Sequence, residues 1–205
     1  MVLLTRLRTK KKEQADQWLF RRLAVVAQSI VGVDNSPIVP SSGLVTEFGL
    51  IERAEVSEVT AERFPDIEVV IAGELIEHIV DAPNLITRVL GEFPNSRVLF
   101  TTPNSTGITN VLLALVNRES QHRDHVCIYS YRTLVRFSGL SSTHELQLRP
   151  YRVSYPEYKS SSTRATRRLV SSLEKFLHLI ERIWPLYSAG WILDFEPIRS
   201  QETSP

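Results

Sequence analysis

The residues best suited to chemistry stand together in the segment Gly73-Glu74-Leu75-Ile76-Glu77-His78. Two carboxylates and an imidazole follow an apolar run that predicts a buried strand. If Glu74 begins a helical turn, Glu74, Glu77 and His78 occupy positions i, i+3 and i+4 and share one face. Such a set can bind a divalent metal, or a carboxylate can strengthen His78 as a general base. The alternative without function is a solvated, charged first turn of a helix.

Asp34 is the second candidate, because it ends the short apolar run from Ile30 to Val33. That pattern indicates a buried strand with a carboxylate at its carboxyl end. In a dinucleotide-type fold, a carboxylate there accepts hydrogen bonds from two ribose hydroxyls. Aspartate is also common in turns and helix caps, so the spacing is consistent with either role.

Two further polar groups follow later in the chain. Thr101-Thr102-Pro103-Asn104 ends another predicted strand, and by itself it indicates only a turn. His122, Asp124 and His125 can be metal ligands or a polar loop, and we favour the loop. With the charged-turn alternative favoured for Glu77 and His78, the sequence predicts no metal site. No Gly-x-Ser-x-Gly, Walker-type or zinc-finger spacing occurs.

Strands alternate with helices along the chain, which predicts βαβ units and a mostly parallel sheet. The expected strands cover residues 30–34, 44–46, 67–72, 97–102, 145–153 and 191–195. The expected helices cover residues 14–28, 85–90, 107–117, 130–137 and 167–184, with Gly91 and Gly139 as terminators. In such sheets ligands bind beyond the carboxyl ends of the strands, where Asp34, Glu74 and Asn104 stand.

Composition is that of a soluble globular protein, with 42% hydrophobic and 23% charged residues among 205. The net charge of +1 gives no global reason to expect nucleic acid. A single cysteine, Cys127, excludes an internal disulfide and fits a cytoplasmic protein. No apolar run reaches the length of about 20 residues that a membrane span needs. In Met1–Lys12 the apolar residues precede the basic ones, which is the wrong order for a secretory signal.

Four segments, taken in order, carry a resemblance. They are Val-Gly-Val-Asp (31–34), Val-Ile-Ala-Gly-Glu-Leu-Ile-Glu-His-Ile (70–79), Val-Leu-Phe-Thr-Thr-Pro-Asn (98–104) and Asp-His-Val-Cys-Ile-Tyr-Ser (124–130). Together they resemble the successive motifs of class I S-adenosylmethionine (SAM) dependent methyltransferases. The most similar group includes the ubiquinone-biosynthesis O-methyltransferases and enzymes of polysaccharide clusters. The resemblance implies a Rossmann-like, doubly wound α/β fold with helices on both faces of a mostly parallel sheet.

The resemblance also implies a role for each candidate residue. Asp34 binds the ribose of SAM, and Gly73 and Glu74 line the cofactor near the transferred methyl group. Glu77 and His78 face a small-molecule acceptor, with His125 on the same side. His78 is then the first choice for the base that deprotonates an acceptor oxygen or nitrogen, and His125 competes with it. Glu77 orients His78.

The sequence departs from the family at two places. The usual glycine-rich turn after the first strand is missing: its place is taken by Thr5–Lys12, which carries five cations, and Gly32 is the first glycine. Arg53 stands where the family often has an acid for the adenine, which leaves Glu55 as the substitute. The chain is therefore either a working methyltransferase with a rebuilt N-terminus or an inactive homologue that serves as a binding subunit.

The domain boundaries follow from the same reasoning. Residues 1–199 are expected to form one domain, in which residues 1–12 are a degenerate first strand and a basic loop; residues 200–205 are a frayed tail. Because loss of a central strand would expose backbone groups, Val2–Leu7 is expected to pair into the sheet. The helix at 167–184 can cover the acceptor site or lie on a membrane, since Arg164, Arg167 and Arg168 precede its apolar face; we favour a helix that covers the sheet.

Overall fold

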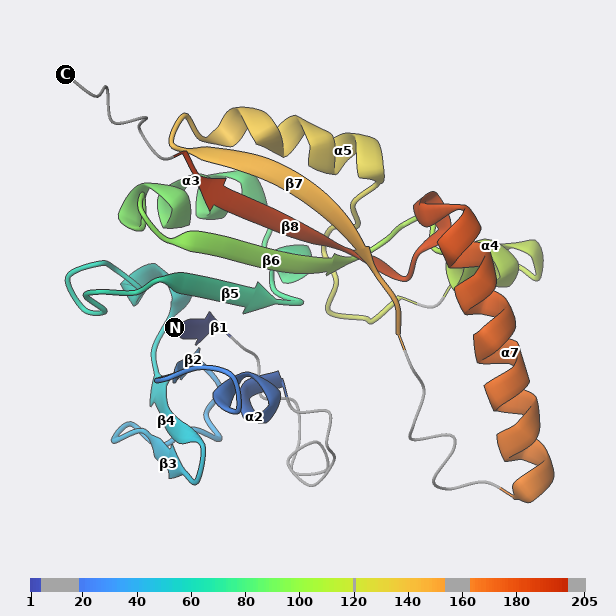
Figure 1. Cartoon of the computed structure of the whole chain (residues 1–205), viewed down its shortest axis with the longest axis horizontal. Coiled ribbons are helices and arrows are strands. Elements are labelled where there is room, and N and C mark those ends of the chain that lie inside the picture. The colour runs from blue at the N-terminus through green and yellow to red at the C-terminus, as the bar shows by residue number, and fades with distance from the viewer. Residues whose placement is uncertain (5–18, 120, 154–162, 199–205) are drawn as a thin grey trace.

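The structure is a computed structural model that describes residues 1–4, 19–119, 121–153 and 163–198. Its centre is an eight-stranded sheet in the order β3-β4-β2-β1-β5-β6-β8-β7 (Figure 1). The strands are β1 (Val2–Leu4), β2 (Val31–Asp34), β3 (Leu44–Thr46), β4 (Gly49–Arg53), β5 (Val69–Gly73), β6 (Arg97–Pro103), β7 (His144–Tyr151) and β8 (Gly190–Pro197). The five strands from β4 to β6 are parallel, while β3 and β8 run antiparallel to their neighbours. The predicted mostly parallel sheet is confirmed.

The helices among the described residues are α2 (Leu19–Ala24), α3 (Ala82–Glu92), α4 (Ile108–Leu115), α5 (Tyr131–Val135) and α7 (Arg164–Ile183). Short 3₁₀ helices are η1 (Val56–Glu58), η2 (Ile76–His78), η3 (Arg136–Leu140) and η4 (Pro185–Tyr187). Ser130 caps α5 as predicted, by accepting a hydrogen bond from the Thr133 amide. Gly91 and Gly139 lie inside α3 and η3, so their expected role as terminators is wrong.

The N-terminal strand lies in the middle of the sheet. Val2 pairs with Val31 of β2 on one side and with Val70 of β5 on the other, and its side chain is fully buried. The expected pairing of the N-terminus is therefore confirmed for residues 2–4, while residues 5–7 lie outside the described part. The backbone of β1 joins the two halves of the parallel sheet.

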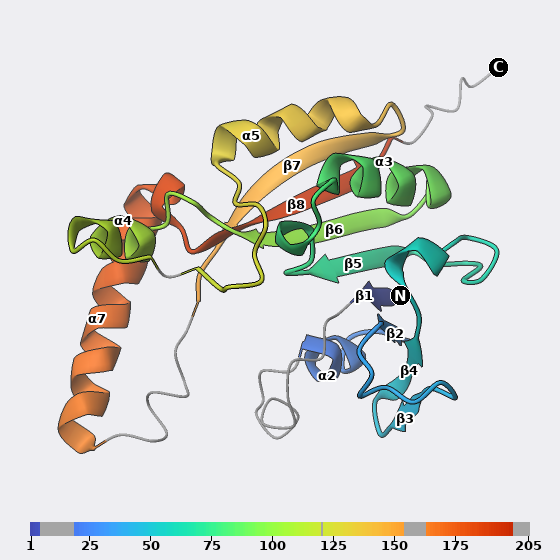
Figure 2. The ribbon, with the colours of Figure 1, turned by 180° about the vertical axis from the view of Figure 1, so that it is seen from behind.

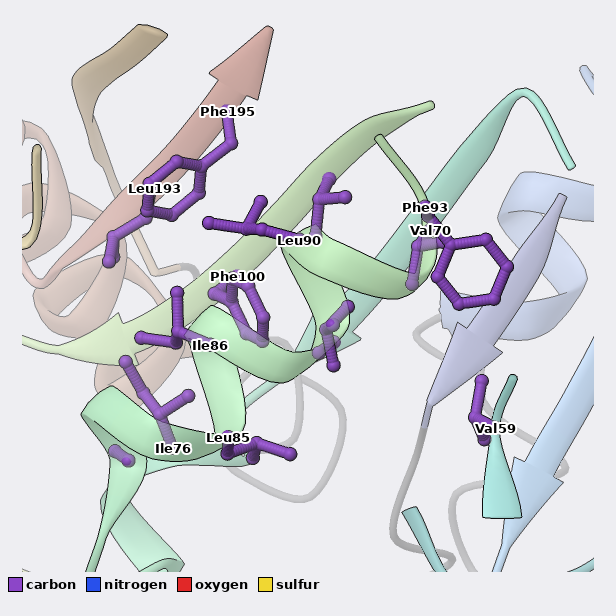
Figure 3. Close-up of a cluster of buried hydrophobic side chains, with 14 of the residues drawn as sticks. Val59, Val70, Ile76, Leu85, Ile86, Leu90, Phe93, Phe100, Leu193 and Phe195 are labelled. Carbon is purple, nitrogen blue, oxygen red and sulfur yellow. The ribbon is translucent and has the colours of Figure 1, made fainter. Parts of the chain in front are cut away.

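Helices pack on both faces of the sheet, and each face has its own core. On one face α3 places Leu85, Ile86 and Leu90 against Phe100 and Leu193 of the strands (Figure 3). On the other face Phe20 of α2 packs into a smaller cluster that includes Ile30, Val39, Ile51 and Ile71. The approach there is tight, because a Cβ on Gly32 would come within 3.1 Å of Phe20. The fold is thus an α/β sandwich of the expected class.

Helices α4 and α7 lie outside this sandwich. Both are placed beyond the carboxyl ends of β5 and β6, and α7 extends away from the sheet (Figures 1 and 2). The expectation that the helix at 167–184 covers the sheet is therefore wrong, and several of its large apolar side chains face solvent. Among the described residues, no helix is both long and apolar enough to cross a membrane.

Candidate functional site

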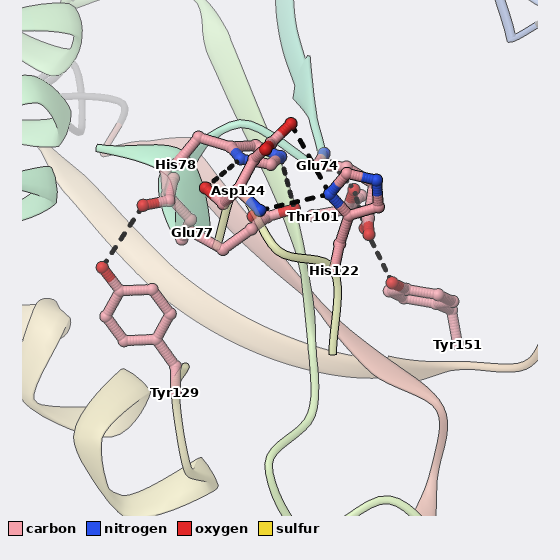
Figure 4. A network of polar contacts seen from close by, with 9 residues as sticks. Glu74, Glu77, His78, Thr101, His122, Asp124, Tyr129 and Tyr151 are labelled. Atoms are coloured by element: carbon pink, nitrogen blue, oxygen red, sulfur yellow. Dashed lines mark hydrogen bonds and ion pairs between the residues drawn. The ribbon is translucent and has the colours of Figure 1, made fainter. Parts of the chain in front are cut away.

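The predicted site residues gather at one edge of the sheet. Asp34 ends β2, Gly73 ends β5 and Pro103 ends β6, and these strands are parallel. Parallel strands bring their carboxyl ends to the same edge, where α/β folds bind ligands. Figure 4 shows the polar network that follows β5.

The chain bends sharply after β5, at Glu74. This residue has a φ of 52°, in the left-handed region, and its amide donates to the carbonyl oxygen (3.2 Å) and to Oγ1 (3.0 Å) of Thr101. A non-glycine residue in this region carries strain that its surroundings must offset. Glu74 therefore does not begin a helical turn, because the 3₁₀ helix begins only at Ile76, and the i, i+3, i+4 arrangement considered for Glu74, Glu77 and His78 does not form.

The Glu74 carboxylate is consequently held apart from Glu77 and His78. Its Oε1 accepts hydrogen bonds from Thr101 Oγ1 (2.9 Å) and from the Tyr151 hydroxyl (2.7 Å). Burial, and then the Glu74 carboxylate, raise the pKa of Tyr151, so the phenol stays protonated and donates. Sequence reasoning missed Tyr151, because nothing local to the end of a predicted strand indicates a partner so far away in the chain.

Glu77, His78 and His125 form a compact cluster. The Glu77 side chain is fully buried, and its Oε1 lies 4.0 Å from His78 Nε2. The rings of His78 and His125 meet edge to face, with centroids 4.7 Å apart. One ligand atom from each of the three residues lies within 4.8 Å of the other two. The structure thus brings together the three residues predicted to face the acceptor.

The hydrogen bond at Nδ1 fixes the tautomer of His78. Nδ1 lies 2.9 Å from the carbonyl oxygen of Asp124. A carbonyl only accepts, so Nδ1 carries the proton and Nε2 presents its lone pair in the neutral ring. Nε2 is the nitrogen on the Glu77 side, and it can either take a proton or bind a metal.

Backbone hydrogen bonds hold the His125 segment against η2. The amides of Val126 (2.9 Å) and Cys127 (3.1 Å) both donate to the carbonyl oxygen of Glu77. His122 is exposed and its Nδ1 lies 3.6 Å from the Asp124 carboxylate. Of the three residues in the predicted polar loop, only His125 lies in the cluster with Glu77 and His78 that could hold a metal ion. Asp124 contributes its backbone carbonyl, which lies within hydrogen-bond distance of His78 Nδ1.

The cluster can do two kinds of chemistry. A basic imidazole nitrogen beside a buried carboxylate can accept a proton from a bound acceptor. A carboxylate and two imidazoles can also ligate a divalent ion, and a ligating histidine typically donates its second ring N–H to a carbonyl, as His78 does to Asp124. The geometry supports both roles.

Asp34 and Glu55 lie together near the ends of β2 and β4. Asp34 is buried, and its Oδ1 accepts a hydrogen bond from the Ser36 amide at 2.7 Å, which is the turn role considered for it. Glu55 is exposed and accepts a hydrogen bond from Asn35 Nδ2 at 3.2 Å. The second strand of this pair, β4, was not predicted, since residues 38–65 have only a weak pattern.

Comparison with known proteins gives a clear result for the fold. No family model matches the sequence, and no curated protein matches it. Among solved structures, a SAM dependent methyltransferase from Archaeoglobus fulgidus superposes with a TM-score of 0.57 at 12% identity, over 95% of this chain and 85% of the other. The methyltransferase domain of a bacterial CtHen1 gives 0.53 at 15% identity, over 95% and 88%. The chain has the fold of a SAM-dependent methyltransferase.

A third solved structure defines how far this likeness extends. The small RNA methyltransferase HEN1 matches with a TM-score of 0.54 at 18% identity over 86% of this chain. The chain spans only 21% of the length of that protein. The methyltransferase fold is therefore shared over a small part of that protein.

Proposed function

We propose that the protein transfers a methyl group from SAM to an oxygen or nitrogen of a small-molecule acceptor. One observation carries the proposal: in a methyltransferase fold, the lone pair of His78 Nε2 is oriented at the carboxyl-end edge of the sheet, beside buried Glu77. Support for SAM as the cofactor comes from the fold, since a solved structure that it matches is described as SAM dependent.

The residues that would hold SAM are those at the ends of β2, β4 and β5. The side chains there fit the nucleoside, because the carboxylates of Asp34 and Glu55 can accept hydrogen bonds from its hydroxyls and amino group. Exposed Glu74 supplies a further carboxylate beside Gly73. Carboxylates also suit the positive charge of a sulfonium. The bound cofactor would supply an electrophilic methyl group.

The chain itself must align the acceptor and remove its proton. His78 Nε2 is our first choice for the proton acceptor, because the Nδ1 bond to Asp124 leaves that nitrogen basic in the neutral ring. Glu77 stabilises the imidazolium that forms, at 4.0 Å from Nε2. His125 is the competing base, since its ring packs against that of His78.

The spacing of the cluster favours a second form of the same function. Because ligand atoms of Glu77, His78 and His125 lie within 4.8 Å of one another, a divalent ion can take the place of the base. Such an ion would lower the pKa of an acceptor hydroxyl by Lewis-acid polarisation. The test is to remove metal with a chelator and then to add Mn²⁺ or Mg²⁺. Activity that returns in the native protein but does not return in Glu77→Gln identifies this form.

Calorimetric titration of SAM into the purified chain tests the proposal first. We expect micromolar binding that Asp34→Ala abolishes, followed by methyl transfer in an acceptor screen that His78→Asn reduces by about 10²–10⁴-fold. Absence of SAM binding by the native chain would refute the proposal that the protein is a methyltransferase. That outcome would support the inactive homologue, for which the glycine-free, basic segment Thr5–Lys12 is the specific argument.

A further inference from the structure

Helix α7 exposes several large apolar side chains and buries two glutamates, unlike an ordinary surface helix. Its apolar residues Leu169 and Phe176 are 69% and 59% exposed, and Leu173, Leu179 and Ile183 are exposed as well. Two glutamates, Glu174 and Glu181, are 7% and 5% exposed and face the protein. A globular helix normally buries its apolar stripe, so this surface calls for a partner that is itself apolar.

Specific contacts hold the polar side of α7 inward. The Glu181 carboxylate lies 3.8 Å from Arg152 Nε, and His178 Nε2 donates to the Val153 carbonyl at 3.2 Å. Both partners follow directly after β7, which ends at Tyr151. The apolar face is therefore turned outward by contacts with the body of the protein.

Cations and interfacial aromatics accompany the exposed apolar face. Arg164, Arg168, Lys175 and Arg182 are all exposed along the helix. Trp184 and Tyr187, just after its end, are 55% and 38% exposed. A helix with a strongly apolar side, a basic polar side and aromatic residues near one end is typical of a segment that lies in the membrane interface.

The neighbouring helix α4 also exposes apolar side chains. Figures 1 and 2 both place α4 beside the C-terminal end of α7. Leu112, Leu115 and Val116 of this segment are exposed. The two segments are also linked, because Asn104 and Thr106, just before α4, hydrogen bond to the Leu186 carbonyl.

We propose that α7, with the exposed part of α4, docks the protein on an anionic phospholipid membrane. The apolar side chains enter the region between headgroups and acyl chains, while the arginines and Lys175 contact lipid phosphates. Charge complementarity selects this occupant, because an apolar protein groove alone would leave the row of cations without a role. The docked edge is the one that carries Glu74, Glu77 and His78, since β6, β7 and β8 meet there at Pro103, Tyr151 and Gly190.

Co-sedimentation with sonicated vesicles tests the proposal on the intact chain. We expect binding to vesicles of phosphatidylcholine and phosphatidylglycerol at 70:30, and about tenfold weaker binding to phosphatidylcholine alone. Leu173→Glu/Phe176→Glu should weaken binding at least about tenfold. The control is Val26→Glu/Val45→Glu, which places two charges on exposed valines outside α7 and α4.

The charge contribution has its own variant. Arg164→Glu/Arg168→Glu should weaken binding to the anionic vesicles about tenfold or more, and leave binding to the neutral ones unchanged. Circular dichroism of each variant checks that the fold is intact. We expect an unchanged spectrum, because all four replaced residues on α7 are exposed. Failure of the native chain to bind anionic vesicles would overturn the proposal.

The experiment must also distinguish membrane binding from binding to a protein partner. If light scattering shows a dimer that Leu173→Glu/Phe176→Glu dissociates, and vesicles do not bind, the face is an interface between copies of the chain and the membrane proposal is wrong. Equal vesicle binding by this variant and by Val26→Glu/Val45→Glu would also overturn it. Neither result depends on SAM turnover.

Discussion

Gly190 lies opposite Tyr151 in the β7–β8 pair. The tyrosine ring occupies the space that a side chain at position 190 would need. A Cβ on Gly190 would overlap three ring or hydroxyl atoms of Tyr151, namely Cζ, Cε1 and Oη. Gly190→Ala must therefore displace the ring or part the two strands. Displacement of the ring also breaks the hydrogen bond from the Tyr151 hydroxyl to Glu74.

The magnitude follows from these two losses. Overpacking of a well-packed site costs about 1–3 kcal/mol. Loss of the bond to Glu74 adds about 0.5–1.5 kcal/mol, because the carboxylate is exposed and water can replace the phenol. We therefore expect Gly190→Ala to lower the free energy of unfolding by about 2–4 kcal/mol. In a Tyr151→Ala background the same change has room, and it should be neutral or stabilise by about 0.4–1 kcal/mol through the unfolded state.

Urea unfolding of the four proteins in this cycle, followed by circular dichroism at 25 °C, measures the effect. Gly91→Ala is the control, since a Cβ at this position in α3 meets no atom within 4 Å and should stabilise the protein by about 0.5–1 kcal/mol. An equal loss from Gly190→Ala in both backgrounds would show that the tyrosine ring is not what excludes a side chain there.

Two other substitutions test buried polar groups. Asn104→Ala should lower the free energy of unfolding by about 2–4 kcal/mol, because Asn104 Nδ2 is the donor to the carbonyls of Leu186 and Ser188; a loss below about 1 kcal/mol in urea would contradict this. Glu181→Gln should raise the melting temperature at pH 8, because burial raises the pKa of Glu181 and the folded state disfavours the carboxylate. That cost is present above the folded pKa and vanishes below the ordinary value of 4.5, so the gain in calorimetry should shrink toward pH 4. Exposed Glu62→Gln serves as its control, and a gain that grows on acidification would be the wrong sign.

Much of the fold was predictable because its signals are local. Buried parallel strands are short apolar runs, and the polar or breaking residue after each run marks its end, as Asp34 and Pro103 do for β2 and β6. The first strand was predicted from the family resemblance together with a backbone argument, since the sheet needs a central partner for β2 and β5. The strand β4 was missed, because its sequence Gly-Leu-Ile-Glu-Arg is short and half polar.

The candidate site was predictable in membership and only partly in geometry. Residues adjacent in sequence, such as Glu77 and His78, were placed by spacing, and His125 was placed by the order of the motifs. Backbone conformation at a single residue was not readable: a positive φ at Glu74 turns its carboxylate toward Thr101 and Tyr151. Contacts of this kind depend on how distant strands are aligned, and a single sequence does not specify that alignment.

The orientation of α7 shows the limit of periodicity arguments. A regular apolar stripe predicts that a helix has one apolar side, and the side chains of α7 confirm this. Periodicity does not say whether that side faces the protein or solvent. Here the buried positions of Glu174 and Glu181 decide the orientation, through contacts such as that between Glu181 and Arg152.

The central place of β1 also has a consequence for the order of folding during synthesis. Val2 has both of its strand partners only after Val70 of β5 has been synthesised. At about 5–20 residues per second, a ribosome needs about 3–14 seconds to synthesise the intervening chain. During that time β1 can pair with β2 alone, and one row of its backbone groups waits for a partner. The sheet therefore closes from a long-range contact, which favours slow folding.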